Sequence, residues 1–404
     1  MAQTVTASNV IDTLKERGFV AQISDEPGLR RALDAGHVTL YQGFDPTATS
    51  LHTGNLVGIM LLAHFQRAGH RPIAVVGGGT GMIGDPSDRD SERPMLPLEV
   101  IERNLAGIRP QFARYLDFSD GKALLVNNAD WLRPRQYIEF LRDVGRHFTV
   151  NQLMQHGTYW DRFQQGSFSF LELNYAVIQA YDFLHLFREY NCLLQIGGND
   201  QWFNILSGRD LIRRAESADA FALTVPLITT SSGTKMGKSL GNAPWLDAER
   251  TSPFEYYQYF RNTDDEAVGR ALRIFTFLPL EEIAELEQLS GADINRAKEV
   301  LAFEATRLTH GEEKAREAQE TARARFRGEG ADAGPSVAMP TPLSIEQLAV
   351  SSGLVKSLSE AKRLIAQNGI RIDGQPATRD RVIEQRDLPL LLSVGKRSVR
   401  IVAA

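Results

Sequence analysis

A histidine, a glycine and an asparagine follow an apolar run early in the chain. In residues 41–55 (YQGFDPTATSLHTGN) a strand-like run gives way to a turn, and His52-Thr53-Gly54-Asn55 opens a helical pattern. Backbone N–H groups at a helix start, with an imidazole donor beside them, suit a phosphate group. A glycine there also allows a flat ring to approach the backbone. The alternative is a strand–turn–helix connection in which His52 only caps the helix.

A glycine-rich segment follows the next apolar run. Residues 75–86 (VVGGGTGMIGDP) contain G-x-G-x-x-G at 79–84, which formally matches the dinucleotide-binding fingerprint. That fingerprint should open a helix, but the polar sequence DPSDRDSERP follows, so a nicotinamide or flavin site is disfavoured. The glycines instead indicate close approach of the backbone to a ligand. Asp85 could then hold a cationic amine, and Arg89 and Arg93 could reach phosphates.

Two lysines lie three residues apart in residues 231–239 (SSGTKMGKS). The ending Gly-Lys-Ser resembles that of a P-loop, but Ser232 stands where the first glycine of a P-loop belongs, and no helix-forming run follows. A P-loop is therefore rejected. Lys235 and Lys238 could close over a polyphosphate and neutralise charge that develops during its cleavage. The alternative is a solvated basic loop.

A long helical pattern at 168–187 carries polar residues on one face. Tyr175, Gln179 and Asp182 fall at positions i, i+4 and i+7, so they share that face. The face is either a solvent-exposed stripe or the wall of a polar pocket.

Another polar group follows the strand-like run at 192–196. The sequence QIGGNDQW at 195–202 places Asp200 and Gln201 after two glycines. The glycines allow a close backbone approach, and an aspartate is a common partner of a ribose diol. A simple β-turn is the alternative.

The elements that must position these groups alternate between strands and helices. Such alternation predicts an α/β fold, with a Rossmann-like parallel sheet and crossover helices. Ligands of such sheets bind beyond the carboxyl ends of the strands, so we expect the site in the loops after Tyr41, Val76 and Ile196. The predicted strands are 37–44, 72–76, 124–127 and 192–196, and the predicted helices of this part are 52–69 and 168–187.

The chain is long enough for more than one domain. We expect a catalytic domain at 1–245, an α-helical domain at 246–328, a Gly/Ala/Pro-rich linker at 329–342 and a small α+β domain at 343–404. Residues 341–404 contain ten basic and six acidic residues, a net charge of +4 within a chain of net charge −5. This asymmetry indicates nucleic acid binding at the C-terminal end.

Composition narrows the class of protein. Hydrophobic residues make up 43% and charged residues 24%, which is typical of a globular protein. A single cysteine, Cys192, can form neither an internal disulfide nor a cysteine-based zinc cluster. No secretory signal and no apolar stretch of about 18 residues is apparent, so we expect a cytoplasmic protein without a membrane span.

The order of these motifs resembles a known family. HTGN early and KMGKS late are similar to the paired motifs that bracket the nucleotide site of class I aminoacyl-tRNA synthetases. The longer strings YQGFDPTA, VVGGGTGMIGDPS, FLRDVGRHFTVN, QAYDFL, LQIGGNDQW, TVPLIT and HGEE resemble bacterial tyrosyl-tRNA synthetases over nearly the whole chain. The C-terminal SLSEAKRLIAQNGIRIDG resembles a small RNA-binding fold that is shared with a ribosomal protein.

The resemblance implies a ligase that forms tyrosyl-adenylate from L-tyrosine and ATP and charges tRNA(Tyr). It implies a homodimer, Mg²⁺ arriving with ATP, and no protein-bound metal. The residues that it implies for catalysis are Thr47, His52, Asn55, Lys235 and Lys238. Those implied for tyrosine binding are Tyr41, Asp85, Asn128, Tyr175, Gln179, Asp182 and Gln201. Those implied for ATP binding are Gly43, Asp45, Gly54, Arg89, Arg93, Gly198, Asp200 and Lys238.

Three departures from the family pattern and two rivals accompany this interpretation. Gly237 replaces a common serine, and Arg89 stands where lysine is frequent. Asn55 stands where the family motif usually has histidine, although an asparagine can still donate a hydrogen bond. A tryptophanyl-tRNA synthetase is a rival of the same class, which Tyr41, Asp182 and the appended C-terminal domain disfavour. A catalytically inactive RNA-binding relative is the other rival, which the presence of His52 and both motif lysines disfavours.

Overall fold

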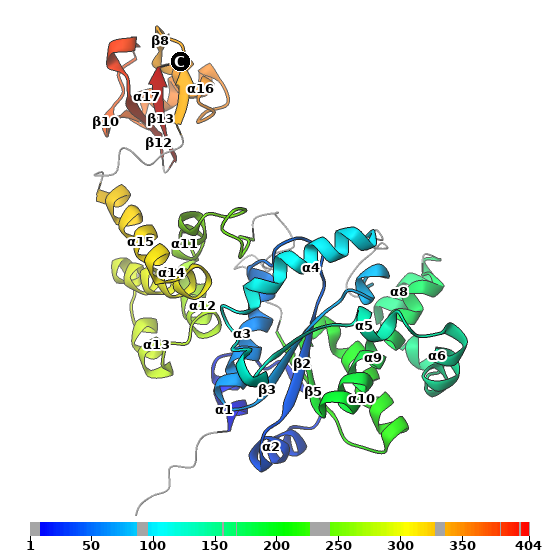
Figure 1. Ribbon diagram of the computed structural model, residues 1–404. Coiled ribbons are helices and arrows are strands. Elements are labelled where there is room, and N and C mark those ends of the chain that lie inside the picture. Colours follow the sequence, from blue (N-terminus) through cyan, green and yellow to red (C-terminus); the bar gives the residue numbers. More distant parts are fainter. Residues whose placement is uncertain are drawn as a thin grey trace, which may run out of the picture. The chain divides into compact units, whose positions relative to one another are not determined.

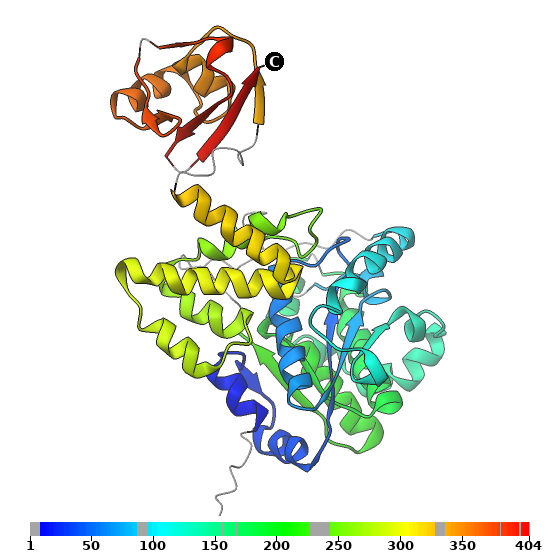
Figure 2. The same cartoon turned by 60° about the vertical axis from the view of Figure 1, so that its left-hand side comes forward.

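The structure is a computed structural model that describes residues 9–86, 96–155, 157–166, 168–226, 243–327, 336–379, 381–395 and 397–403. The chain forms two compact units, Met1–Ala315 and Arg316–Ala404, which we call unit 1 and unit 2. Figure 1 labels their helices and strands, and Figure 2 shows them from a second side.

Unit 1 contains a six-stranded sheet with the order β1-β6-β5-β2-β3-β4. Strands β2 to β6 are parallel, and the two-residue β1 pairs antiparallel with β6. The α/β prediction with a parallel sheet is therefore confirmed, whereas β1 and β6 lie outside the predicted set. The strands span β1 Gln22–Ile23, β2 Thr39–Phe44, β3 Arg71–Val76, β4 Leu124–Asn127, β5 Cys192–Gly198 and β6 Phe221–Val225.

Helices cover both faces of this sheet (Figure 1). Helix α3 packs against β2 and β3, and it is buried nearly all round because α1 and α12 cover its other side. Helices α9 and α10 pack against β5 and each other. The helices before the helical region are α1 Val10–Glu16, α2 Glu26–Ala35, α3 Thr53–Arg67, α4 Leu98–Phe112, α5 Ala129–Leu132, α6 Tyr137–Asp143, α7 Val150–Leu153, α8 Gly157–Gln164, α9 Phe170–Tyr190 and α10 Trp202–Glu216.

The ends of α9 follow from its sequence. Ser169 caps the first turn in a capping box with Glu172, which satisfies backbone N–H groups that a helix start leaves free. Asn191, with a φ of 51°, adopts the left-handed conformation that ends the helix.

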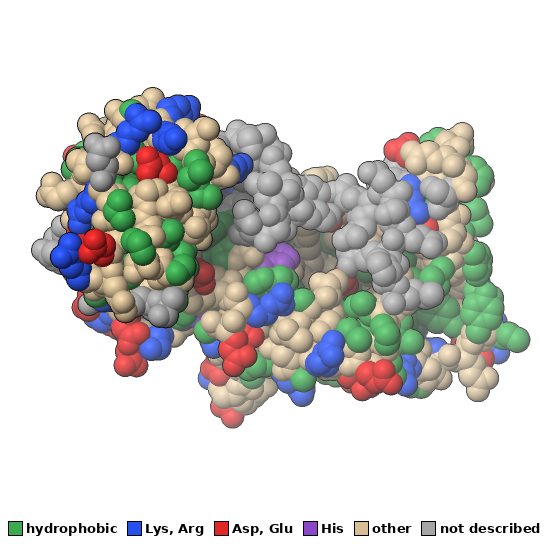
Figure 3. All heavy atoms as spheres, turned by 90° about the horizontal axis from the view of Figure 1, so that it is seen from above, with side chains coloured by type: hydrophobic (Ala, Val, Ile, Leu, Met, Phe, Trp, Pro, Cys, Tyr) green, Lys and Arg blue, Asp and Glu red, His purple; other side chains and the backbone are tan. Residues whose placement is uncertain are grey.

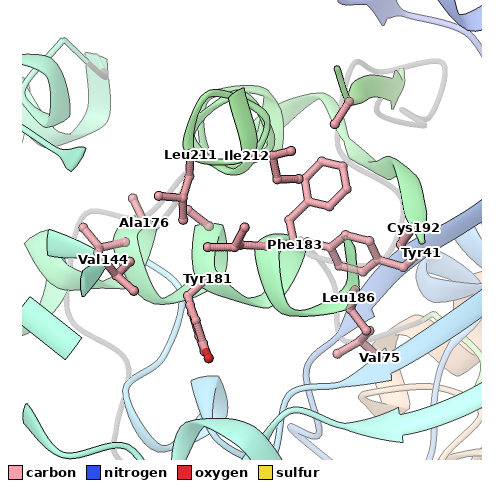
Figure 4. Close-up of a cluster of buried hydrophobic side chains, with 14 of the residues drawn as sticks. Tyr41, Val75, Val144, Ala176, Tyr181, Phe183, Leu186, Cys192, Leu211 and Ile212 are labelled. Carbon is pink, nitrogen blue, oxygen red and sulfur yellow. The ribbon is translucent and has the colours of Figure 1, made fainter. Parts of the chain in front are cut away.

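Buried apolar side chains of α9 and α10 form a core against the sheet. Figure 4 shows Phe183 of α9 beside Tyr41 of β2, and their ring centroids are 5.3 Å apart. Since side chains of a helix point along fixed faces, this contact fixes how α9 is rotated against the sheet.

The predicted helical region after the sheet is confirmed. It contains α11 Pro253–Arg261, α12 Val268–Phe275, α13 Leu280–Glu287, α14 Ile294–His310 and α15 Glu312–Arg327. Helix α15 begins in unit 1 and continues into unit 2.

Unit 2 is a small α+β fold with its own apolar core. Its five-stranded sheet has the order β10-β9-β12-β13-β7, and β11 pairs with β8. Ile345, Leu348, Ile370, Leu392 and Ile401 are among the fully buried side chains. Its elements are β7 Ser336–Met339, β8 Leu343–Ser344, α16 Ile345–Ser351, α17 Leu358–Ala366, β9 Ile370–Ile372, β10 Gln375–Pro376, β11 Val382–Ile383, β12 Leu390–Val394 and β13 Arg397–Ala403. Among the described helices of both units, none combines the length and apolarity that crossing a membrane requires.

Candidate active site

A cleft of about 560 Å³ opens at the carboxyl ends of the parallel strands. The chain runs outward from β2 through β3 to β4, then returns to the other side of β2 with β5 and β6. Ligands of parallel sheets bind where the strand order reverses in this way. The ends of β2 and β5 both line the cleft, which therefore opens at the end of the sheet where the sequence predicts the site.

Every predicted site residue that the structure describes lines this one cleft. They come from segments far apart in the chain, and the sheet brings their strand ends together. The remaining four, Arg89, Arg93, Lys235 and Lys238, lie outside the described residues. The lining set comprises Tyr41, Gly43, Asp45, Thr47, His52, Gly54, Asn55, Asp85, Asn128, Tyr175, Gln179, Asp182, Gly198, Asp200 and Gln201.

His52 caps helix α3 and lines the cleft at the same time. Its Nδ1 accepts a hydrogen bond from the Gly54 N–H at 3.0 Å, so the proton of the neutral ring lies on Nε2. Burial lowers the pKa of His52 below its ordinary value, which keeps the ring neutral at physiological pH. The capping interpretation and the ligand interpretation are thus compatible, because the cap occupies one ring nitrogen and leaves the other as a donor.

Asn55 completes the same capping box. Its Oδ1 accepts the His52 N–H at 3.1 Å. The Asn55 side-chain amide NH₂ is therefore the group that can donate a hydrogen bond to a ligand.

A buried carboxylate lies at the inner end of the cleft. Asp182 is 4% exposed, and its two oxygens accept hydrogen bonds from Trp131 Nε1 at 2.7 Å and Asn128 Nδ2 at 2.9 Å. Burial raises the pKa of Asp182 to about 7, although both hydrogen bonds act in the opposite direction. The face with Asp182, Gln179 and Tyr175 is thus the wall of a polar pocket and not a solvent-exposed stripe.

A second buried oxygen lies on the same part of the wall. The Tyr41 hydroxyl is buried and has no hydrogen-bond partner among the described residues. Burial, followed by the nearby Asp182 charge, raises the pKa of Tyr41 well above its usual value, so it is a neutral hydroxyl. A buried polar group without a partner is costly, which points to a ligand group that would satisfy it.

Amide and carboxyl groups form a connected network across the cleft wall. Gln201 Nε2 donates to Asp85 Oδ2 at 2.7 Å, and Gln201 Oε1 accepts from Asn204 Nδ2 at 3.1 Å. Gln179 Nε2 lies 3.5 Å from Gln201 Oε1, and Gln179 Oε1 is buried without a partner among the described residues. This wall offers acceptors to a cationic group.

Close backbone approach is visible where β3 ends. A Cβ on Gly78 would lie 2.2 Å from Asn127 Oδ1, so the loop has no room for a side chain there. The glycine-rich segment continues into a single 3₁₀ turn, Thr80–Met82, and the next described helix is α4. A dinucleotide-binding helix would begin directly at these glycines, so this geometry agrees with the rejection of that site.

Trp131 and Thr80 are among the residues that the sequence reasoning missed, and both hold polar side chains of the pocket wall. Trp131 donates to Asp182, and Thr80 Oγ1 accepts a hydrogen bond from Asn128 Nδ2 at 2.9 Å. Asn128 Oδ1 also accepts the Gly79 N–H at 2.7 Å, so this amide ties the glycine-rich loop to α9. A buried indole N–H needs an acceptor, but nothing in the spacing of Trp131 indicates which one.

The comparisons with known proteins identify the class. The profile of the family described as "tRNA synthetases class I (W and Y)" matches residues 33–327, and the S4 domain profile matches residues 345–382. The chain therefore belongs to the class I tRNA synthetases of this tryptophan and tyrosine family.

The curated relatives are more specific. The tyrosine–tRNA ligase of Clostridium botulinum (strain Hall) is 49% identical over 379 residues, 92% of either chain. That of Clostridium beijerinckii is 46% identical over 400 residues, covering 97% of this chain and 98% of the relative. A solved structure, the C-terminally truncated mitochondrial tyrosyl-tRNA synthetase of Aspergillus nidulans, aligns with a TM-score of 0.73 and 30% identity, covering 80% of this chain and 95% of that chain.

Proposed function

We propose that the cleft activates L-tyrosine with ATP to form tyrosyl-adenylate and pyrophosphate. The tyrosyl group is then transferred to the 3′-terminal adenosine of tRNA(Tyr). This is the reaction of a tyrosine–tRNA ligase, an ATP-dependent aminoacyl-tRNA synthetase, and it agrees with the names of the relatives at 46–49% identity.

The observation that carries the proposal is the pair of buried oxygens at the inner end of the cleft. A phenol hydroxyl placed there would donate to Asp182, which has lone pairs beyond the two used by Trp131 and Asn128. It would also accept from the Tyr41 hydroxyl, which otherwise has no partner among the described residues. An unsubstituted phenyl ring would leave both groups unsatisfied, so the pocket selects tyrosine over phenylalanine.

The opposite end of the amino acid fits the amide and carboxyl network. The ammonium group of the substrate would bind Asp85, Tyr175 and the free Gln179 Oε1. Gln201 holds Asp85 in place through the 2.7 Å hydrogen bond. The substrate carboxylate then faces the nucleotide end of the cleft, where His52 and Thr47 lie.

The chemical step needs no nucleophile from the protein. A carboxylate oxygen of tyrosine attacks the α-phosphorus in line, the bond to the bridging oxygen breaks, and pyrophosphate leaves. Catalysis then consists of positioning the reactants and stabilising charge on the phosphate. His52 Nε2–H and the Thr47 hydroxyl are the donors that would meet this charge. In the second step a ribose hydroxyl of tRNA attacks the tyrosyl carbonyl carbon and AMP leaves.

The described residues on either side of the lysine segment support a role for its lysines at the pyrophosphate. Val225 and Pro226 line the cleft just before residues 227–242, and the Thr53 N–H donates to Pro244 O at 3.1 Å just after them. Lys238 precedes Pro244 by only six residues in the sequence. We propose that Lys235 and Lys238, with Arg89 and Arg93, neutralise the leaving group.

The remaining ATP contacts are proposed from the strand ends. Gly198 ends β5 and Asp200 follows it, and both would meet the ribose. Gly43, Asp45 and Gly54 would lie against the rest of the nucleotide. Mg²⁺ is expected to arrive as the counter-ion of the ATP phosphates. Among the described residues no group of three His, Cys, Asp or Glu side chains is arranged to hold a metal ion.

Exchange of pyrophosphate into ATP, dependent on the amino acid, tests the proposal. We expect exchange with tyrosine, little with phenylalanine and none with tryptophan. Exchange with tryptophan alone would establish the rival synthetase. A protein that binds tRNA but supports no exchange would be a non-catalytic relative.

Unit 2 is proposed to bind tRNA. It contains the S4 domain match, and residues 341–404 carry a net charge of +4. Basic surfaces bind the phosphate backbone through charge, so this contribution should weaken as salt increases. We propose that the two-step reaction takes place in the cytoplasm, where tRNA is charged.

Removing residues 343–404 should separate the two half-reactions. We expect the shortened protein to keep pyrophosphate exchange with tyrosine, because every described cleft residue lies in unit 1. Charging of tRNA(Tyr) should fall at least about tenfold in kcat/KM, since lost phosphate contacts weaken binding by such factors. Unchanged charging at physiological salt would assign unit 2 another role.

A homodimer is proposed from an exposed apolar surface on unit 1. Its members are Tyr137 and Ile138 of α6, Val150 of α7, Trp160 and Phe163 of α8, and Phe170 of α9, each at least half exposed. Figure 3 shows apolar side chains gathered along the side of unit 1 that carries these helices. An apolar patch of this kind is typical of a protein–protein interface.

Charge placed in this surface should dissociate the dimer. Ile138 is 79% exposed, so Ile138→Asp is expected to give a monomer in light scattering. The folded subunit itself should keep its melting temperature, because the substitution lies on its surface. Leu358→Asp is the matched control, since Leu358 is a half-exposed apolar residue of unit 2. Dissociation by the control, or a dimer in the Ile138 variant, would contradict the assignment of the interface.

A further inference from the structure

The loop between β2 and α3 carries Thr47 and His52, and one helix outside the cleft holds it. We propose that Asn104 and Gln111 of α4 are positioning residues that fix these two side chains for adenylate formation. The inference rests on the proposed function, because it assigns the loop's chemistry to the α-phosphate.

Gln111 holds the end of the loop that leads to His52. This side chain is 5% exposed, and its Oε1 accepts the Leu51 N–H at 2.9 Å and lies 3.3 Å from Ser50 Oγ. Its Nε2 donates back to Gly107 O of the same helix at 3.2 Å, which fixes the orientation of the amide. The residue directly before His52 is thus tied to α4 through its backbone.

Leu51 and Ser50 are also held by residues beyond the lysine segment. The Leu51 carbonyl accepts the Leu246 N–H at 2.8 Å, and Ser50 Oγ accepts the Asp247 N–H at 3.2 Å. Both partners follow the segment with the motif lysines. Gln111 therefore lies at the point where the His52 loop meets the chain that leaves the lysine segment.

Asn104 holds the other end of the loop. It is 3% exposed, and its Nδ2 donates to Pro46 O at 2.8 Å, directly before Thr47. The Thr47 N–H in turn donates to Asp45 O at 2.9 Å in the same turn. Asn104 thus ties the loop to α4 through the Pro46 carbonyl, directly before Thr47.

Between these two residues α4 touches the loop backbone. A Cβ on Gly107 would lie 2.2 Å from Thr49 O, so the helix has no room for a side chain there. Positions 104, 107 and 111 fall on one face of a helix, at spacings of three and four residues. The loop 46–51 lies along this face, tied at both ends and in contact at its middle.

Stabilisation of charge on a phosphate requires hydrogen-bond donors that are held in place. A donor that meets developing charge on phosphate contributes only when it is already in place, and a displacement of about 1 Å costs as much as 100-fold in rate. Asn104 and Gln111 reach no cleft atom themselves, since neither lines the cleft. Their effect on rate must therefore pass through Thr47 and His52.

Single substitutions give the first test. Gln111→Met keeps the shape and removes the acceptor of the buried Leu51 N–H, and we expect kcat for adenylate formation, counted per active site, to fall at least about tenfold. The KM for tyrosine should stay within about twofold, because Gln111 makes no hydrogen bond to any of the residues proposed to bind tyrosine. Gln111→Glu retains the oxygen acceptor and should restore most of the rate. Gly107→Ala should lower kcat without deleting any hydrogen bond.

A matched control separates positioning from general stability. Gln66 of α3 also bridges backbone groups, donating to Asp117 O at 2.8 Å and accepting the Asp117 N–H at 3.0 Å, but it does not line the cleft. Gln66→Met should lower the melting temperature and leave kcat per site unchanged. A Gln111→Met protein that loses only active sites, with kcat per remaining site intact, would overturn the proposal.

Double-mutant cycles decide which side chain each residue positions. We expect Gln111→Met to cost less than about threefold in a His52→Ser background, while its cost persists with Thr47→Ala. Asn104→Leu should instead cost little in a Thr47→Ala background and keep its cost in a His52→Ser background. Additive cycles in both cases would overturn the proposal. Absence of tyrosine-dependent exchange in the unaltered protein would instead count against the proposed function, so the two failures are distinct.

Discussion

Asp182→Ala is expected to lower kcat/KM for tyrosine activation about 10- to 100-fold, because a buried hydrogen bond to a charged group contributes roughly 1.5–3 kcal/mol. The same substitution leaves Trp131 Nε1 and Asn128 Nδ2 without their acceptor. The preference for tyrosine over phenylalanine should shrink with it, since phenylalanine never used the carboxylate. Pyrophosphate exchange with both amino acids measures the effect.

Glu189→Ala is the matched control for this experiment. Glu189 is an exposed carboxylate near the end of the same helix and does not line the cleft. Its loss should change exchange by less than twofold, as expected for a surface substitution. Near-normal tyrosine activation in the Asp182 variant would remove this residue from the phenol pocket.

The raised pKa of Asp182 gives the reaction a pH dependence with a definite sign. The phenol hydroxyl makes a stronger hydrogen bond to the carboxylate than to the neutral acid. Burial places the pKa of Asp182 at about 7, so kcat/KM should fall as the pH drops through 7. His52 does not cause this fall in kcat/KM at acidic pH, since burial lowers the pKa of His52 from 6.5. The fall in kcat/KM at acidic pH should therefore persist in the His52→Ser variant and vanish in the Asp182→Ala variant.

The raised pKa of Asp182 also makes the stability of the fold depend on pH, and stability changes in the opposite direction from activity. The pKa of Asp182 rises from 3.8 when unfolded to about 7 when folded, so the native state holds the extra proton between these values. This residue's contribution to stability accordingly falls as the pH rises from about 4 to 7. Denaturant unfolding of the Asp182→Ala protein should lack this decline.

His52→Ser is expected to slow adenylate formation about 100- to 1,000-fold, the range for removing one preorganised donor to a developing charge. Serine is a strong N-cap residue, so it can replace the Nδ1 acceptor of the Gly54 N–H without reaching the phosphate. The KM for tyrosine should stay nearly constant, because the proposed partner of His52 is the phosphate and not the amino acid. Rapid-quench measurement of adenylate gives the rate.

His52→Ala separates the two roles of this histidine. It removes both the donor and the cap, so it should match serine in rate but unfold at a free energy lower by about 1 kcal/mol. A serine variant with nearly full activity would show that capping is the whole function of His52.

Local patterns were sufficient for most elements of the sheet domain. The predicted strand 124–127 coincides with β4, and the predicted helices 52–69 and 168–187 differ from α3 and α9 by at most three residues at either end. These elements carry strong signals, namely continuous apolar runs and caps such as Ser169. Strand β1 has only two residues, so no periodicity could reveal it.

The sequence by itself determined which residues could do chemistry, their order along the chain and the end of the sheet where they belong. Only the tertiary structure decided that the polar face of α9 is a pocket wall, because a helical stripe looks the same whether water or protein covers it. Burial in the packed pocket wall likewise raises the pKa of Asp182, although the hydrogen bonds from Trp131 and Asn128 lower it. Gln111 and Asn104 hold the loop between β2 and α3 through contacts between residues 58 to 60 apart, and such pairings depend on how separately formed elements pack.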